Sequence, residues 1–237
     1  MFKPFAPLLV LAALVVSCGD DNPTSPNNGT IVSPKIGSTF TYEAYSTDTT
    51  TGLPVAETRD TVVMTVSRTG LTFGGMTNVT ETITIDGADT IVSYYRVDGN
   101  NDVLTYTTGA ILQVEGWFTI PNSSKATKTS VIIDSTSIDV TGAEPDTTRI
   151  KAIHTATYVG EETMVVKGES IKVVKIAMVW HESIVSSAFA FTINVPYTLY
   201  FASSLGTICR YEQDVLTADD GARSPGIYRG LIDYQLK

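Results

Sequence analysis

The chain has few of the residues on which cysteine and histidine chemistry depends. Its 237 residues include only two cysteines, Cys18 and Cys209, and two histidines, His154 and His181. These four residues do not have the spacing of a zinc site. The sequence also contains no serine nucleophile elbow, phosphate-binding loop or glycine-rich dinucleotide turn. We therefore expect no metal and no cofactor, and the sequence predicts a protein that is not an enzyme.

Positive charge is scarce as well. The chain has 16 lysines and arginines against 25 aspartates and glutamates, which gives a formal net charge of −9. An acidic surface repels phosphate backbones and anionic headgroups. We therefore expect no nucleic-acid partner, and contact with a membrane would have to depend on lipid rather than on basic patches.

The long apolar run of the chain lies at its N-terminus. Lys3 is followed by an apolar stretch from Phe5 to Val16 and by the small residue Ser17. A basic start, an apolar segment of about a dozen residues and a small residue at its end are the parts of a secretory signal, too short to span a bilayer stably. Residues 1–17 are therefore predicted to be a signal peptide.

The four residues Val15, Val16, Ser17 and Cys18 resemble the lipobox of bacterial lipoprotein precursors. The resemblance implies that the signal is cut between Ser17 and Cys18 and that acyl chains, palmitate among them, are carried by the cysteine. Three such chains exceed the two hydrophobic signals that stable anchoring needs. Because Gly19 rather than aspartate follows the cysteine, the resemblance implies a lipid-anchored protein of the bacterial cell envelope, in the outer membrane. The alternative is a secreted protein in which Cys18 has no special role.

Residues 19–35, "GDDNPTSPNNGTIVSPK", contain three prolines, two glycines and little apolar content. Such a composition cannot offset the entropy lost on ordering, so residues 18–35 are predicted to be a disordered tether that holds the body away from the membrane. Residues 36–237 are then one folded domain. If the sulfur of Cys18 carries lipid, Cys209 has no disulfide partner within the chain, and we interpret Cys209 as a small buried hydrophobe.

From Ile36 onward, no segment of a dozen residues has helical apolar spacing. Apolar residues instead alternate with polar ones in several stretches, among them residues 39–45, 60–67, 186–195 and 227–237. A period of two with one polar face indicates an antiparallel sheet that is covered on one side. About a dozen strands are expected, and a sheet of that size must curl or fold onto itself. The predicted fold class is all-β: one strongly curved antiparallel sheet, as a half-barrel or barrel, or else a β-sandwich.

Turn signals separate these stretches and favour hairpins between successive strands, so the expected topology is up-and-down. The predicted turns are residues 68–70, 86–89, 98–102, 159–162 and 167–170.

One of these turns, "DGNND" at residues 98–102, also has to be tested as a calcium loop. Asp98, Asn100 and Asp102 match the first ligand spacings of an EF-hand. However, Val103 stands where a glycine is needed, and Gly109 stands where a glutamate should complete the site. The stretch is therefore predicted to be a plain turn between a strand that ends at Val97 and one that starts at Val103.

Two stretches of the last third of the chain carry a looser resemblance. "MVVKGESIKVVKI" (164–176) and "PYTLYFASSLGTICRYE" (196–212) are similar to hairpins of uncharacterised exported bacterial proteins whose curved sheet resembles that of the LolA and LolB lipoprotein carriers. The helices that plug such half-barrels have no counterpart in the sequence pattern. The resemblance therefore implies a curved sheet and nothing further.

Two classes of function remain open at this level. In the first, the protein is a non-catalytic envelope lipoprotein whose β domain binds a partner protein or an apolar ligand. Its aromatic residues would mainly fill the core, although on a curved sheet they could also line a cavity for an apolar or sugar-like ligand. The aromatic residues concerned are Trp117, Phe118, Trp180, Tyr197, Tyr200 and Phe201.

In the second class, the protein is an envelope hydrolase or a carbohydrate-binding or carbohydrate-active lipoprotein. Hydrolysis of a glycoside needs two carboxylates that face each other across a cleft. Glu115, Asp134 and Glu182 are candidates, but their spatial separation cannot be obtained from the sequence. His181 and Glu182 would not form an acid–base pair because adjacent strand residues point to opposite faces. Both histidines are therefore interpreted as structural.

Overall fold

The computed structural model describes residues 30–108, 115–122, 127–139, 146–217, 221 and 223–237. The strands are β1 (Thr39–Ser46), β2 (Asp60–Phe73), β3 (Met76–Asp86), β4 (Asp89–Val97), β5 (Val103–Thr108), β6 (Glu115–Ile120), β7 (Lys128–Asp139), β8 (Asp146–Val166), β9 (Glu169–Val185), β10 (Ala190–Ala202), β11 (Thr207–Gln213), β12 (Leu216–Thr217), β13 (Arg223–Ser224) and β14 (Ile227–Gln235). One 3₁₀ turn, η1 (Ala56–Thr58), is the helical element of the described residues. Among these residues, no helix has the length and apolar character needed to cross a membrane.

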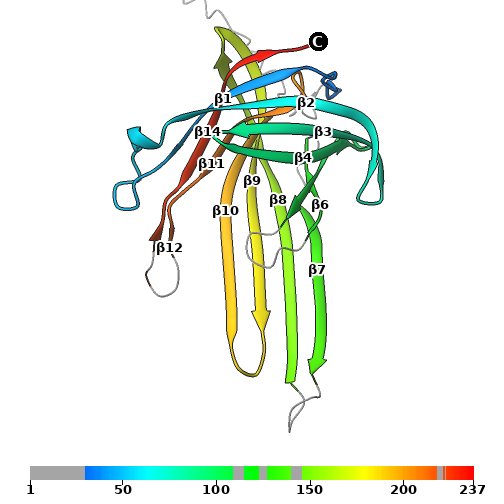
Figure 1. Ribbon diagram of the computed structural model, residues 1–237, viewed down its shortest axis with the longest axis vertical. Helices are drawn as coiled ribbons and strands as arrows, with labels where there is room; N and C mark the ends of the chain where they lie inside the picture. The colour runs from blue at the N-terminus through cyan, green and yellow to red at the C-terminus, as the bar shows by residue number, and fades with distance from the viewer. Residues whose placement is uncertain (1–29, 109–114, 123–126, 140–145, 218–220, 222) are drawn as a thin grey trace, which may run out of the picture.

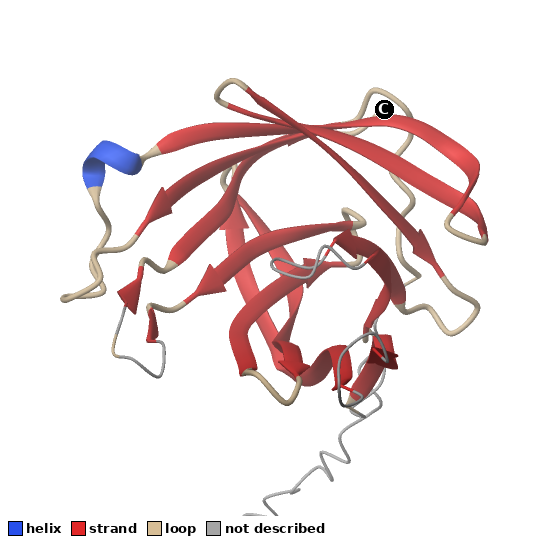
Figure 2. Ribbon diagram, turned by 60° about the horizontal axis from the view of Figure 1, so that its bottom comes forward, coloured by secondary structure: helices blue, strands red, loops and turns tan. Residues whose placement is uncertain are grey.

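Twelve strands form a single antiparallel sheet in the order β6-β5-β4-β3-β2-β1-β14-β11-β10-β9-β8-β7, and β12 pairs with β13 in a separate ribbon. In Figure 1, β7 to β10 run along the long axis of the molecule, and β2 to β4 cross them near the top. Figure 2 shows the sheet curling round on itself. The predicted all-β class with one strongly curved sheet of about a dozen strands is confirmed.

The two edge strands of the sheet come close enough to make it nearly closed. The backbone N–H of Thr119 on β6 donates to the hydroxyl of Ser130 on β7 at 3.1 Å. A Cβ added to Gly116 on β6 would lie 2.9 Å from the side chain of Ile132 on β7, so only glycine fits there without a shift. Contacts that involve side chains thus connect β6 and β7, which are not paired by backbone hydrogen bonds as neighbouring strands of the sheet. The sheet is therefore barrel-shaped.

The up-and-down topology holds for β1 to β6 and for β7 to β11, where each strand pairs with the next. It fails at the C-terminus, because β14 pairs with β1 on one side and with β11 on the other. This insertion joins the two meanders into one sheet. The last strand of the chain therefore lies at the centre of the structure rather than at an edge.

The predicted turns at residues 86–89, 98–102 and 167–170 are confirmed as hairpin connections, and the strand limits at Val97 and Val103 are as expected. Two other predicted turns are wrong. Residues 68–70 lie inside β2, and residues 159–162 lie inside β8. In both places the register shifts, so the glycine belongs to a β-bulge that bends a long strand instead of ending it.

The core consists of two clusters of buried residues. One is built around Phe40, Val62 and Cys209, and the other around Ile120, Met178 and Phe201. Ile31 belongs to the second cluster and is 6% exposed, and the N–H of Val32 donates to the carbonyl of Ser203 at 2.8 Å. Ile31 is therefore packed into the core, whereas Val32 is exposed and is held by its backbone against the turn after β10.

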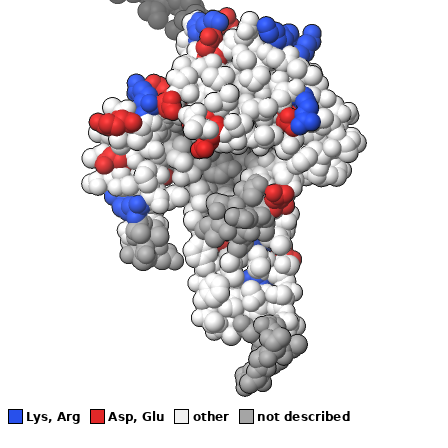
Figure 3. Space-filling model, in the orientation of Figure 1, with Lys and Arg blue, Asp and Glu red and all other residues white. Residues whose placement is uncertain are grey.

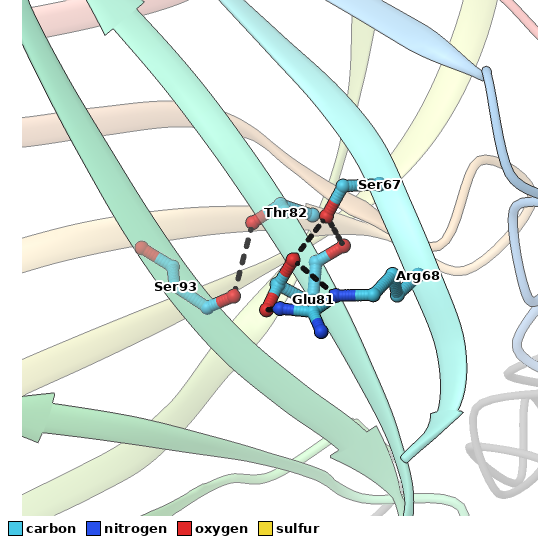
Figure 4. Close-up of polar contacts among 5 residues, drawn as sticks. All are labelled: Ser67, Arg68, Glu81, Thr82 and Ser93. Carbon is cyan, nitrogen blue, oxygen red and sulfur yellow. Dashed lines mark hydrogen bonds and ion pairs between the residues drawn. The ribbon is translucent and has the colours of Figure 1, made fainter.

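An ion pair between the exposed Arg68 and the buried Glu81 stabilises the bulged part of β2 against β3. The guanidinium of Arg68 donates from Nε to the carboxylate of Glu81 at 2.8 Å, and the Ser67 hydroxyl donates to the same carboxylate at 2.7 Å (Figure 4). These hydrogen bonds lower the pKa of Glu81 below its usual value, the bond from Arg68 being the larger cause. The pair stabilises the fold above the usual carboxyl pKa, and this contribution is lost as the pH falls through the lowered pKa.

Candidate functional site

The concave side of the sheet encloses a cavity of about 400 Å³. Strands from both meanders and the strand β14 that joins them contribute to its wall. Its apolar lining consists of Met64, Val103, Ile120, Phe201, Ile208 and Ile227. A volume in this range is typical of pockets for small molecules.

Hydroxyl groups also line the cavity. Threonine and serine side chains from β3, β4, β5 and β11 reach it: Thr82, Thr84, Ser93, Thr105 and Thr207. On β3, Thr82 and Thr84 are buried, whereas Ile85 beside them is 54% exposed. On this part of β3, polar side chains therefore point to the inside of the sheet and the apolar side chain of Ile85 points to solvent. The cavity lining is therefore mixed, with aliphatic and aromatic groups next to neutral hydrogen-bonding groups.

Four tyrosines add aromatic surface to the lining: Tyr42, Tyr94, Tyr95 and Tyr211. The hydroxyl of Tyr42 donates to the carbonyl of Ile208 at 3.0 Å and lies 3.1 Å from the hydroxyl of Thr207. Burial raises the pKa of Tyr42 and Tyr211, and it raises the pKa of Tyr95 to about 12. The phenols of these three tyrosines are therefore neutral near pH 7, and Tyr42 is held in place by two polar contacts.

Arg229 on β14 is the charged side chain among the described residues that line the cavity. It stands opposite Tyr211 on β11 and Ala44 on β1, and its side chain is 34% exposed. One of its terminal nitrogens, Nη2, donates to Asp86 at 2.9 Å. Asp86 ends β3, which is separated from β14 by β1 and β2 in the sheet. The ion pair therefore spans the concave side of the sheet, at the rim of the cavity.

His154 lies on β8, outside the cavity lining, and is 2% exposed. Its imidazole stacks on Phe118 with ring centroids 3.9 Å apart, and its Nε2 is hydrogen-bonded to the hydroxyl of Tyr197. Burial lowers the pKa of His154 to about 4, so the ring is neutral at physiological pH. Its Nδ1 and the indole N–H of neighbouring Trp180 have no hydrogen-bond partner among the described residues. The burial of His154 agrees with the prediction of a structural histidine, although not all of its hydrogen-bonding groups are satisfied by described residues.

His181 and Glu182 do point to opposite faces of β9, as predicted. His181 is partly exposed and hydrogen-bonds through Nδ1 to Asn194 at 2.8 Å, whereas Glu182 is fully buried. The other two candidate carboxylates are engaged elsewhere: Asp134 pairs with Arg149 on the exposed side of β7, and Glu115 accepts a hydrogen bond from Tyr106. The structure does not bring these three acids together as a facing pair.

Three further sequence predictions can be compared with the structure. Cys209 is fully buried with a free thiol, and burial raises its pKa to about 12, so it is the inert hydrophobe that was expected. Residues 98–102 form a turn in which Asp98 accepts hydrogen bonds from the N–H groups of Asn100 and Asp102 at 2.9 Å. Within the described part of the chain, no cluster of three His, Cys, Asp or Glu residues could hold a metal ion. Ser17 and Cys18, the predicted cleavage and lipidation site, lie outside the described residues.

The aromatic residues singled out in the sequence mostly fill the core. Of the six, only Phe201 lines the cavity. Trp180 is buried beside His154, and Tyr200 lies under the guanidinium of Arg210 at 3.7 Å. Trp117 packs against the tip of the β2–β3 hairpin and donates from its indole to the carbonyl of Gly74. Sequence reasoning missed Arg229 and the hydroxyl groups of the lining. The threonine-rich alternation of β3 was the only signal for these hydroxyl groups.

Comparisons with known proteins add little to this description. No family model and no curated protein sequence matches the chain. Two solved structures resemble it. One is a protein of Parabacteroides distasonis that is provisionally described as a lipoprotein, with 10% sequence identity, a TM-score of 0.46 and coverage of 87% of this chain and 99% of that one. The other is a protein of Bacteroides fragilis that is provisionally described as an exported protein with a YmcC-like fold, with 12% identity, a TM-score of 0.42 and the same coverage.

Proposed function

We propose that the protein is a non-catalytic, lipid-anchored protein of the bacterial envelope whose barrel-shaped domain binds a small apolar molecule. The cavity carries this proposal. Its volume of about 400 Å³ and its largely apolar lining with a few hydrogen-bonding groups are typical of ligand sites. The lipobox of residues 15–18 and the proline-rich residues that follow it support the anchor and the tether.

A small ligand accounts for the structure better than a partner protein or a catalytic reaction does. The apolar groups concerned are on the inside of the sheet, where a globular partner cannot reach them. Among the described lining residues, none is a carboxylate, an imidazole or a thiol that could act as acid, base or nucleophile. Binding and release are therefore the chemistry that the cavity supports.

The test is a cavity-filling substitution in a soluble form of the mature chain. This soluble mature chain comprises residues 18–237 with Cys18→Ala, exported behind an ordinary secretory signal. The neutral dye N-phenyl-1-naphthylamine, which becomes fluorescent in apolar surroundings, is the probe. We expect saturable binding with one site, and Ser93→Phe is expected to weaken it about tenfold or more, equivalent to about 1.4 kcal/mol, because the ring occupies cavity volume.

Ser137→Phe is the matched control, because Ser137 is exposed on β7 and is not among the residues that line the cavity. It should leave the affinity of the dye unchanged. Thermal unfolding of both variants shows that the fold is retained. Absence of saturable dye binding by the unsubstituted chain, or equal affinity of the Ser93→Phe and unsubstituted chains, would contradict the proposed function.

A further inference from the structure

The charge at the rim of the cavity indicates what kind of ligand the cavity takes. Arg229 is the one charged residue among the described lining residues, in a chain with a net charge of −9. On the face shown in Figure 3, basic and acidic side chains lie next to each other rather than in an extended positive patch. An anion is therefore not attracted by the general field of the protein and has to be recognised by a local group.

The guanidinium of Arg229 has donors left for such a ligand. It uses Nη2 for Asp86, whereas a guanidinium carries five N–H donors in a planar fork. The bond to Asp86 fixes the direction of the side chain across the concave face. It also partly neutralises the positive charge, so the site matches a single negative charge better than two.

The groups around Arg229 define the remainder of the ligand. Ile227, two residues away on β14, and Met64 on β2 line the same cavity, and Val103, Ile120 and Phe201 extend its apolar lining. The cavity volume of about 400 Å³ lies near the lower end of the usual range for ligand pockets, which favours one acyl chain over two. A molecule with a linear apolar chain and an anionic end matches both the apolar side chains of the lining and the guanidinium of Arg229.

We infer that the cavity binds a single-chain amphiphile with a monoanionic head, of which a fatty carboxylate is the simplest. The head lies at Arg229, and the chain lies against the apolar side chains of the lining. This inference rests on the proposed function, since it requires the cavity to bind a ligand at all. It adds the headgroup chemistry and assigns Arg229 as the residue that selects it.

The experiment is displacement of N-phenyl-1-naphthylamine from the soluble mature chain by three compounds, each below its critical micelle concentration: dodecanoate, dodecanol and dodecyl phosphate. In the unsubstituted chain, dodecanoate should displace the dye at about tenfold lower concentration than dodecanol, because a hydrogen-bonded charge pair is added. Dodecyl phosphate, which is largely dianionic at pH 8, should be weaker than dodecanoate. In Arg229→Gln, dodecanoate and dodecanol should displace the dye at about equal concentrations, each corrected for the affinity of the dye for that variant.

Two further variants separate headgroup recognition from structural effects. Arg229→Lys, which keeps the positive charge, should retain part of the preference for dodecanoate. Arg149→Gln removes an arginine that also pairs with an aspartate, but on the exposed side of β8, and should retain all of it. Equal displacement by dodecanoate and dodecanol in the unsubstituted chain, or an undiminished preference in Arg229→Gln, overturns the inference while the proposed function stands. If the dye itself does not bind, both are overturned.

Discussion

Replacement of Cys18 by alanine is expected to abolish the incorporation of labelled palmitate into the protein. The reason is chemical: the thiol of Cys18 is the acceptor of the diacylglycerol in the lipobox resemblance, and alanine has no nucleophilic atom. Without acyl chains, the acidic mature chain has no other expected attraction for an anionic membrane. The soluble mature chain defined above, which lacks the cysteine and the original signal, should therefore be found in the soluble fraction after lysis.

The second cysteine provides a matched control for this experiment. Cys209 is fully buried in the core, and burial raises its pKa, so its thiol is not available for acylation. Cys209→Ala should keep the full palmitate label and the membrane location. Retention of label by Cys18→Ala, or its loss in Cys209→Ala, would show that Cys18 is not the lipid attachment site.

Phe40→Ala is expected to reduce the free energy of unfolding by about 3–5 kcal/mol, which is the usual cost of removing a fully buried phenylalanine. Phe40 is 0% exposed on β1, and its neighbours across the sheet are Met64 on β2 and Tyr234 on β14. It therefore lies where the first strand meets the strand that joins the two meanders. A cavity at this point weakens the junction on which the closed shape depends. Urea unfolding followed by tryptophan fluorescence measures the change.

Phe189→Ala is the matched control, because it removes a phenylalanine ring from an exposed position that contributes little to the free energy of unfolding. Phe189 is 54% exposed at the β9–β10 hairpin, so its loss should change the free energy of unfolding by less than about 0.5 kcal/mol. Similar losses for the two variants would mean that Phe40 is not part of the main core. That outcome would also remove the support for β14 as the central strand.

Local sequence patterns predicted the strands well. The alternation of apolar and polar residues with a period of two depends only on which face of each strand is covered. In residues 39–45, the alternation placed Phe40, Tyr42 and Ala44 on one face, and Phe40 and Tyr42 are buried. The turn signals, in contrast, misplaced the turns at Gly70 and Gly160. A glycine next to polar residues indicates a chain reversal, yet in a long bent strand the same residues relieve curvature as a bulge.

The ligand site could not be predicted from the same patterns, since they assume that apolar side chains point inward. On β3, Thr82 and Thr84 face the cavity, and Ile85 faces solvent. Arg229 gave no local signal either, because its role depends on Asp86, 143 positions earlier in the chain. Pairing of β14 with β1 and β11 sets this geometry, and such long-range pairing leaves no trace in a window of a few residues.

The most direct test of the account is native mass spectrometry of the full protein extracted from the cells that make it. The account predicts a polypeptide that starts at Cys18 with added acyl mass, together with a species that carries one further small molecule. That molecule should leave on collisional activation and should be missing from the Ser93→Phe variant. A chain without acyl mass, or an acylated chain that never carries a dissociable small molecule, would contradict the account.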